Sequence, residues 1–114
     1  MTSKENHIKW MGEAVKEAQK AAKKDEVPIG AVAVAGDKVV MRSHNIRERT
    51  HNPLGHAELL LLEKLSKKQR SWRLTDVTIY VTCEPCLMCA GALLQARVRR
   101  VVYGCADPKA GACG

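Results

Sequence analysis

The sequence contains no phenylalanine, and its aromatic side chains are limited to two tryptophans and two tyrosines. Hydrophobic residues still make up 46% of the 114 positions, so the chain has enough apolar material for a core. That core must be built mainly from Val, Leu, Ile and Ala. The length suits one domain and leaves no room for two. We therefore expect a single domain over residues 1–114 with an aliphatic core.

Long hydrophobic runs are also missing. The longest apolar stretches, Ile29–Ala35 and Leu59–Leu62, are far shorter than the ~18 residues of a membrane-spanning helix. The first six residues are polar, and no apolar segment typical of a secretory signal follows them. These absences predict a protein that does not enter a membrane and that resides in the cytoplasm.

Acidic residues are in the minority. The chain has 12 Asp and Glu against 19 Lys and Arg, which gives a net charge of +7. The basic residues are dispersed along the chain, and no run of them forms a basic tail. A positive balance suits a polyanionic partner such as nucleic acid, but a solvated surface explains the charge equally well.

Hydrophobic periodicity predicts an α-β-β-α-β-α-β order of elements. The expected elements are a helix over Lys4–Lys24, strands over Ile29–Ala35 and Lys38–Ser43, a loop over His44–Gly55, a helix over His56–Lys68, a strand over Asp76–Thr82, a helix from Pro85 to Gln95 and a strand over Val98–Tyr103. A hairpin followed by strand–helix–strand units predicts a mixed central sheet with helices on both faces.

The strongest local signal is the pair Cys86 and Cys89 behind Pro85. Residues three apart share a helix face, so both thiols can bind one ion, and the start of a helix favours the thiolate form. Five cysteines without a secretory signal argue against a disulfide framework. A structural zinc site would need a further Cys or His pair at matching spacing, and the candidate pair, Cys105 and Cys113, lies in a glycine-rich tail.

Two other uses of these thiols stay open. The Cys83-x2-Cys86-x2-Cys89 spacing suggests an iron–sulfur cluster, but the further cysteine that such a cluster expects does not follow shortly after it. A thioredoxin-like redox pair requires no metal. Both alternatives compete with a zinc site that recruits its third ligand from another part of the chain.

His56 is the candidate for that third ligand. Like Cys86 it lies where a helix begins, and two helix starts at one end of a sheet can meet over the strand ends. Three protein ligands that leave a fourth place for water are the arrangement of a catalytic zinc site. Glu58 would then lie beside the water without binding the metal. Its alternative role is that of a stabilising acid in the first turn of a helix.

The segments His56-Ala57-Glu58 and Pro85-Cys86-Leu87-Met88-Cys89 together resemble the zinc signature of the cytidine deaminase-like superfamily. Further stretches are similar to its tRNA-specific adenosine deaminase branch: Glu26–Val32, Gly55–Glu58, Ser71–Leu74, Tyr80–Thr82, Glu84–Cys86, Met88–Ala92, Val101–Gly104 and Asp107–Ala112. The resemblance spans nearly the whole chain. It implies a three-layer α/β/α fold with a mixed central sheet and one deaminase domain over residues 1–114.

The chain departs from this family at two places. Family members usually carry Thr-Ala before the histidine, where this sequence has Leu54-Gly55. Family members also continue with a last strand and C-terminal helices that contribute to RNA binding, and we expect these elements to be missing from a chain that stops at Gly114.

The resemblance implies one Zn²⁺ per chain held by His56, Cys86 and Cys89, with Glu58 as the catalytic proton carrier. The implied reaction is the hydrolytic deamination of adenosine to inosine at the wobble position of a tRNA anticodon loop, performed by a homodimer. The residues expected to contact the substrate are Asn45, Val27, Pro28 and Ala57. Those expected to hold RNA phosphates are Arg47, Arg49, Arg73 and Lys109.

Two rival functions remain at this stage. Thr82-Cys83-Glu84-Pro85-Cys86 also occurs in relatives that act on guanine, which favours a small-molecule deaminase of a guanine, cytosine or nucleoside substrate. The expected lack of C-terminal elements favours an inactive, zinc-stabilised RNA-binding subunit. Ammonia release from tRNA, from free bases or from neither distinguishes the three.

Overall fold

The computed structural model describes residues 3–46 and 51–105. The elements follow the predicted order, and they are α1 (Ser3–Lys23), β1 (Gly30–Ala35), β2 (Lys38–His44), α3 (Ala57–Gln69), β3 (Thr78–Val81), α4 (Leu87–Ala96) and β4 (Arg100–Tyr103). Within the described ranges, no helix has both the length and the apolar character needed to span a bilayer.

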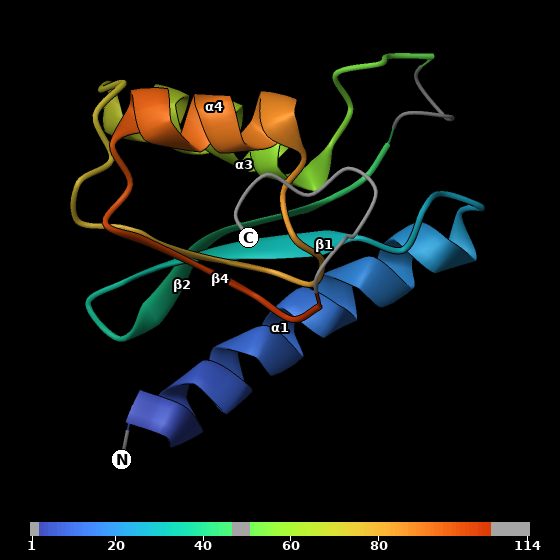
Figure 1. Ribbon diagram of the computed structural model, residues 1–114, viewed down its shortest axis with the longest axis horizontal. Helices are drawn as coiled ribbons and strands as arrows, with labels where there is room; N and C mark the ends of the chain where they lie inside the picture. The colour runs from blue at the N-terminus through green and yellow to red at the C-terminus, as the bar shows by residue number, and fades with distance from the viewer. Residues whose placement is uncertain (1–2, 47–50, 106–114) are drawn as a thin grey trace.

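The four strands form one mixed sheet in the order β2-β1-β3-β4 (Figure 1). Strand β1 pairs antiparallel with β2 and with β3, whereas β3 and β4 are parallel. Parallel neighbours require a crossover connection, and α4 provides it. The mixed sheet expected from the sequence is therefore confirmed.

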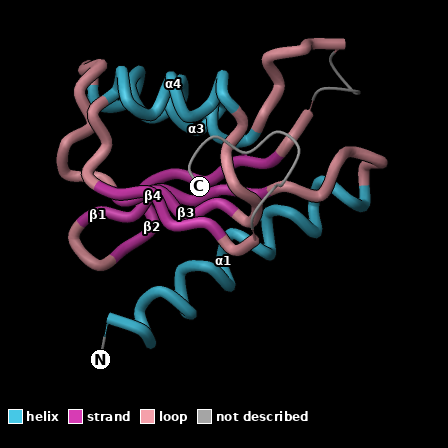
Figure 2. The backbone as a smooth tube through the Cα atoms, in the orientation of Figure 1, coloured by secondary structure: helices cyan, strands magenta, loops and turns pink. Residues whose placement is uncertain are grey.

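Helix α1 covers one face of the sheet, and α3 and α4 cover the other (Figure 2). The period of two along β1 divides the core between these faces. Ala31 and Ala33 pack in the cluster under α3 and α4, whereas Val32 and Val34 pack against Trp10 of α1. All the buried members of the larger cluster are aliphatic, as the lack of phenylalanine predicts.

Three predicted boundaries move by a few residues. Strands β3 and β4 are each shorter than expected, because Val77 closes a turn onto Leu74 and Arg97 ends α4 in a left-handed conformation. Pro85 does not open α4 as predicted. The helix begins at Leu87, and Cys86 precedes it as the N-cap residue with an extended backbone (ψ 175°).

Gly30 allows α1 to lie directly on the sheet. A Cβ atom at this position would approach the Ala14 carbonyl oxygen and the Ala18 nitrogen to 2.3 Å. Both atoms belong to the helix backbone, so they could yield only if the whole helix moved. The start of β1 is therefore fixed against α1 by the absence of a side chain.

An ion-pair network connects α1 to the end of β2. Glu17, whose side chain is 3% exposed, accepts hydrogen bonds from Lys20 (2.6 Å) and Arg42 (3.2 Å). Its other oxygen lies 3.1 Å from Nδ1 of His44. Burial alone would raise the pKa of Glu17, but its hydrogen bonds to Lys20, His44 and Arg42 outweigh burial and lower the pKa.

We expect Glu17→Gln to destabilise the fold by about 2 kcal/mol at pH 7, because hydrogen bonds to a charged group are lost. A carboxyl whose folded-state pKa is depressed stabilises above its unfolded pKa of about 4.3, and this contribution disappears as the pH falls through the folded pKa. Urea unfolding should therefore show a smaller difference between the two proteins at pH 3 than at pH 7.

Glu63→Gln provides a matched control, since Glu63 is 62% exposed and pairs with Lys67 on the same helix. Exposed pairs of this kind contribute about 0.5 kcal/mol or less. A Glu17→Gln effect that is the same at both pH values would show that the network stabilises through packing and not through charge.

Candidate metal centre

Two helix starts meet at the end of the sheet where β2 and β3 finish. His56 is the N-cap residue of α3, Cys86 is the N-cap residue of α4, and Cys89 lies in the first turn of α4. The sulfur of Cys86 lies 3.8 Å from Nδ1 of His56, and the sulfur of Cys89 lies 3.5 Å from the same nitrogen. The three candidate ligands predicted from sequence therefore lie together.

Backbone hydrogen bonds hold both helix starts in place. The Ile46 N–H donates to the Gly55 carbonyl (2.9 Å) and so closes the base of the loop before His56. On the other side, the Thr82 N–H donates to the Gly30 carbonyl (3.0 Å), and the Glu84 N–H donates to the Cys105 carbonyl (2.8 Å). These bonds fix the segments that lead into α3 and α4.

Neither N-cap side chain caps its own helix. A helix start leaves backbone N–H groups without partners, and an N-cap side chain normally accepts from one of them. His56 and Cys86 both have the extended backbone of an N-cap residue but make no such bond. The sulfur of Cys86 and Nδ1 of His56 instead lie 3.8 Å apart, so both side chains are available to bind an ion between the two helix starts.

The spacing of the three donor atoms fits a zinc ion. Tetrahedral zinc has bonds of about 2.3 Å to sulfur and about 2.0 Å to nitrogen, which places those two atoms about 3.5 Å apart. The observed sulfur-to-nitrogen distances are 3.5 and 3.8 Å, and all three donor atoms lie within 4.8 Å of one another. One imidazole and two thiols are also a donor set that zinc prefers.

The alternative metal sites weighed from the sequence lack this geometry. Cys83 is not part of the group that could hold an ion, although the iron–sulfur spacing includes it. Cys105 is exposed and donates to the Thr82 carbonyl. Cys113, the last possible member of a structural zinc site, lies outside the described residues.

Glu58 lies beside the thiols and is only 4% exposed. Burial raises the pKa of its carboxyl, and a hydrogen bond with Cys89 partly offsets this effect. Burial also raises the pKa of the Cys89 thiol, and the neighbouring Glu58 and Cys86 add to the rise. Both shifts disfavour the charged forms of Glu58 and Cys89, and a cation bound here would stabilise those charged forms.

Two of the four expected substrate contacts are exposed and two are buried. Val27 and Pro28 are exposed just before β1. Asn45 is 2% exposed, and its Oδ1 accepts a hydrogen bond from the Ala57 N–H (2.7 Å). The Ala57 side chain is fully buried, so in this conformation neither that side chain nor its N–H faces outward.

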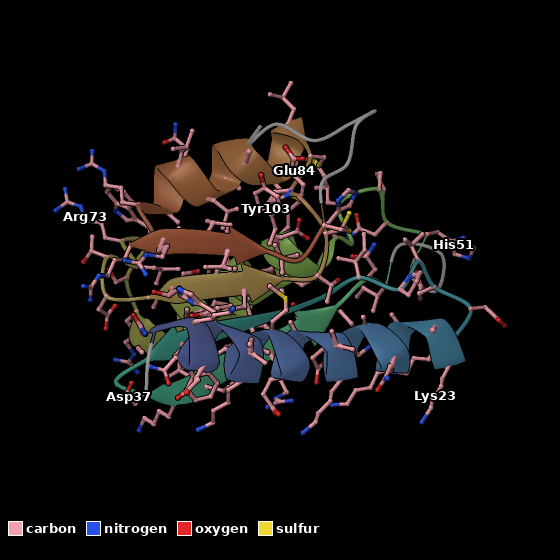
Figure 3. The ribbon with its side chains drawn as sticks, turned by 60° about the horizontal axis from the view of Figure 1, so that its bottom comes forward. Lys23, Asp37, His51, Arg73, Glu84 and Tyr103 are labelled. Carbon is pink, nitrogen blue, oxygen red and sulfur yellow. The ribbon has the colours of Figure 1, made fainter. Side chains whose placement is uncertain are left out.

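Arg73 does not lie where the sequence prediction placed it. In Figure 3, Arg73 lies at the left edge of the molecule, whereas Glu84, which is two residues from Cys86, lies near the middle of its upper side. The Arg73 guanidinium is stacked 4.8 Å from the ring of the exposed Trp72, near the end of α4. That helix is about 15 Å long, which separates Arg73 from the metal centre.

Arg47, Arg49 and Lys109, the other expected phosphate contacts, lie outside the described residues. Ser43 was not singled out by the sequence, although it contacts the segment that carries the site: its hydroxyl donates to the carbonyl of Ala57. The period of two in β2, which places Ser43 and Asn45 on one face, was the available signal.

The MafB19-like deaminase family model matches residues 5–111. A tRNA-specific adenosine deaminase of Bacillus subtilis is 50% identical over 105 residues, which cover 92% of this chain and 65% of the relative. The chain therefore spans about two thirds of the length of this curated relative.

Two solved structures share the fold. One comes from a study of A-to-I editing by tRNA:A34 deaminases at the wobble position of transfer RNA. Its TM-score is 0.88 and its sequence identity is 42%. The match covers 92% of this chain and 76% of the chain in that structure. The other is a guanine deaminase from Bacillus subtilis, with a TM-score of 0.84 and 29% identity. This match covers 93% of this chain and 66% of the guanine deaminase chain. The predicted deaminase-like α/β fold is thus confirmed.

Proposed function

We propose that this chain, which belongs to the MafB19-like deaminase family, is the zinc-dependent catalytic domain of a tRNA adenosine deaminase that produces inosine at the wobble position. The observation that carries the proposal is the convergence of His56, Cys86 and Cys89 within 4.8 Å, beside the buried carboxyl of Glu58. The 50% identity with a tRNA-specific adenosine deaminase supports this choice of substrate.

His56, Cys86 and Cys89 would hold one zinc ion, with Nδ1 as the imidazole ligand. When bound, zinc makes a water molecule acidic enough to act as a nucleophile near neutral pH. Three protein ligands would suit that chemistry, because catalytic zinc sites typically combine three protein ligands with a water molecule. The tight placement of both helix starts keeps these ligands in position without rearrangement.

Glu58 would move the protons of the reaction. Its carboxylate would accept a proton from the attacking water and deliver it to the ring nitrogen. It would then carry the second proton, from the new hydroxyl on the same carbon, to the departing amino group, which leaves as ammonia. A bond from carbon to oxygen forms and the bond from the same carbon to the exocyclic nitrogen breaks, so adenosine and water give inosine and ammonia. Burial suits this role, since it raises the pKa toward the range in which a carboxyl exchanges protons readily.

The substrate base would enter from an anticodon loop, where bases are unpaired and can be splayed into a pocket. Val27 and Pro28, exposed before β1, would contact the base, and Asn45 would contact it through its NH2 group, because its oxygen is bound to Ala57. A contact with the Ala57 N–H would require that bond to open. The net charge of +7 supports binding to the phosphates of an RNA.

We also propose that the protein acts as a homodimer in the cytoplasm. Leu87 and Leu94 of α4 are each 79% exposed, and Trp72 beyond the end of α3 is 57% exposed. Exposed apolar side chains on a helix that carries metal ligands support burial of this face by a second copy. Sedimentation equilibrium that gives the mass of a monomer at micromolar concentration would reject the dimer.

Nucleoside mass spectrometry of treated RNA tests the enzymatic proposal. We expect inosine at the wobble position of a tRNA that carries adenosine there, and none in a matched tRNA whose wobble base is guanosine. Free guanine is the essential parallel substrate, since a guanine deaminase shares the fold. Ammonia from guanine without inosine in tRNA would replace the proposal with a free-base deaminase, and RNA binding without ammonia from either would indicate an inactive binding subunit.

A further inference from the structure

We infer that Ser43 is a positioning residue of the metal centre, which acts with Asn45 by binding both backbone polar groups of Ala57. The inference deepens the proposed function and rests on it, because Ala57 lies between the proposed ligand His56 and the proposed proton carrier Glu58. Neither Ser43 nor Asn45 needs to touch the metal to have this effect.

The contacts come from one face of β2 and its continuation. The Ser43 hydroxyl donates to the Ala57 carbonyl, and Oδ1 of Asn45 accepts from the Ala57 N–H at 2.7 Å. Both side chains are 2% exposed, and Ala57 is fully buried. We name this pair of hydrogen bonds the Ala57 clamp. It fixes the orientation of one peptide segment in a region where water does not compete for the bonds.

The need for a clamp follows from the N-cap position of His56. Because this imidazole faces the two thiols, it makes no hydrogen bond that caps α3. The N–H of Ala57, at the first position of this helix, also has no carbonyl partner within the helix. Asn45 supplies an acceptor for it from outside the helix, and Ser43 holds the carbonyl on the other side of the same residue.

The opposite face of the strand is held as well. His44, between the two clamp residues, has Nδ1 3.1 Å from the buried carboxylate of Glu17 on α1. The Asn45 N–H donates to the Ile29 carbonyl (3.1 Å), which extends the pairing with the segment before β1. The end of β2 is therefore anchored on both sides, and it can serve as a rigid support for Ala57.

A rotation at Ala57 would move both neighbouring side chains. His56 and Glu58 are attached to the two peptide groups that the clamp holds, so loss of one bond changes the direction of the imidazole relative to Cys89. Groups that orient metal ligands in this way typically contribute about 10-fold to 100-fold in metal affinity or activity. Ser43 contributes by position alone, because its hydroxyl is engaged with the backbone.

Cobalt(II) provides a readout that a merely structural residue would not change. The comparison includes the wild type, Ser43→Ala and Ser43→Thr. In the cobalt-loaded proteins we would measure the thiolate-to-metal absorption bands. In the zinc-loaded proteins we would measure kcat and KM on tRNA. The expected result is that Ser43→Ala shifts the bands and lowers kcat about 10-fold with little change in KM, and that Ser43→Thr, which keeps the hydroxyl, restores both.

Ser66→Ala is the matched control, since Ser66 also donates its hydroxyl to a backbone carbonyl of α3 but is remote from the metal centre. It should leave the spectrum and kcat unchanged. Wild-type bands and wild-type kcat in Ser43→Ala would overturn the clamp while leaving the enzyme proposal intact. A wild-type protein that gives no thiolate-to-cobalt bands and no inosine would instead overturn the proposed function, and the clamp with it.

Discussion

Glu58→Gln is expected to lower the deamination rate by a factor on the order of 10²–10⁴, with zinc still bound. The amide keeps the size of the carboxyl in a site where Glu58 is only 4% exposed, but it cannot accept and release a proton. The three ligand side chains are unchanged, so the metal content should match that of the wild type. Inosine formation at limiting enzyme and elemental analysis of the purified protein measure the two quantities.

Glu63→Gln is the control for this substitution, because Glu63 lies on the same helix and is 62% exposed. It should retain wild-type turnover. Normal deamination by Glu58→Gln would remove the proton-carrier role, even if the metal proved to be present. Loss of zinc from Glu58→Gln would show instead that this carboxyl contributes to metal binding.

Cys89→Ala is expected to abolish both zinc binding and activity, and to lower the melting temperature of the zinc-loaded preparation. Two ligands remain after this change, and two cannot complete the arrangement that zinc requires. Because zinc binds the folded chain, losing it also removes its contribution to stability. Elemental analysis should fall from one zinc per chain to near zero, and thermal unfolding should show the same loss as treatment of the wild type with a chelator.

Cys105→Ala tests whether the loss is specific to the metal centre. Its thiol is exposed and donates to the Thr82 carbonyl at 3.5 Å, away from the three ligands. This variant should keep its zinc, its melting temperature and its activity. A Cys89→Ala protein that still holds one zinc per chain would contradict the ligand set, and would direct attention to Cys83 and the iron–sulfur spacing.

Glu58→Gln and Cys89→Ala each change a group in the same electrostatic arrangement. Burial raises the pKa of Glu58 and of Cys89, and the two groups lie against each other with Cys86 as a third neighbour. A cation bound at this site would therefore stabilise the negative charges of Glu58 and Cys89. In the proposed site, the charged forms of the ligands and of the proton carrier would depend on the ion, and binding of the ion would depend on the two helix starts that bring these residues together.

The sequence by itself determined the order of the elements, the aliphatic core and the residue types of the candidate metal centre. These features depend on short-range spacing: the apolar period within a segment, and the three-residue step from Cys86 to Cys89. Its pattern also placed His56 and Glu58 at a helix start, which the structure confirms. Local spacing carries this information because residues that are close in sequence are close in any helix or strand.

Only the tertiary structure decided which residues from distant parts of the sequence come into contact. The contact of His56 with Cys89 joins residues 33 positions apart, and the Ser43 bond to Ala57 joins residues 14 apart. The same limit applies to Arg73, which the sequence could not assign to one end of the sheet or the other. Such contacts depend on how strands pair and helices pack, and no local pattern fixes that geometry.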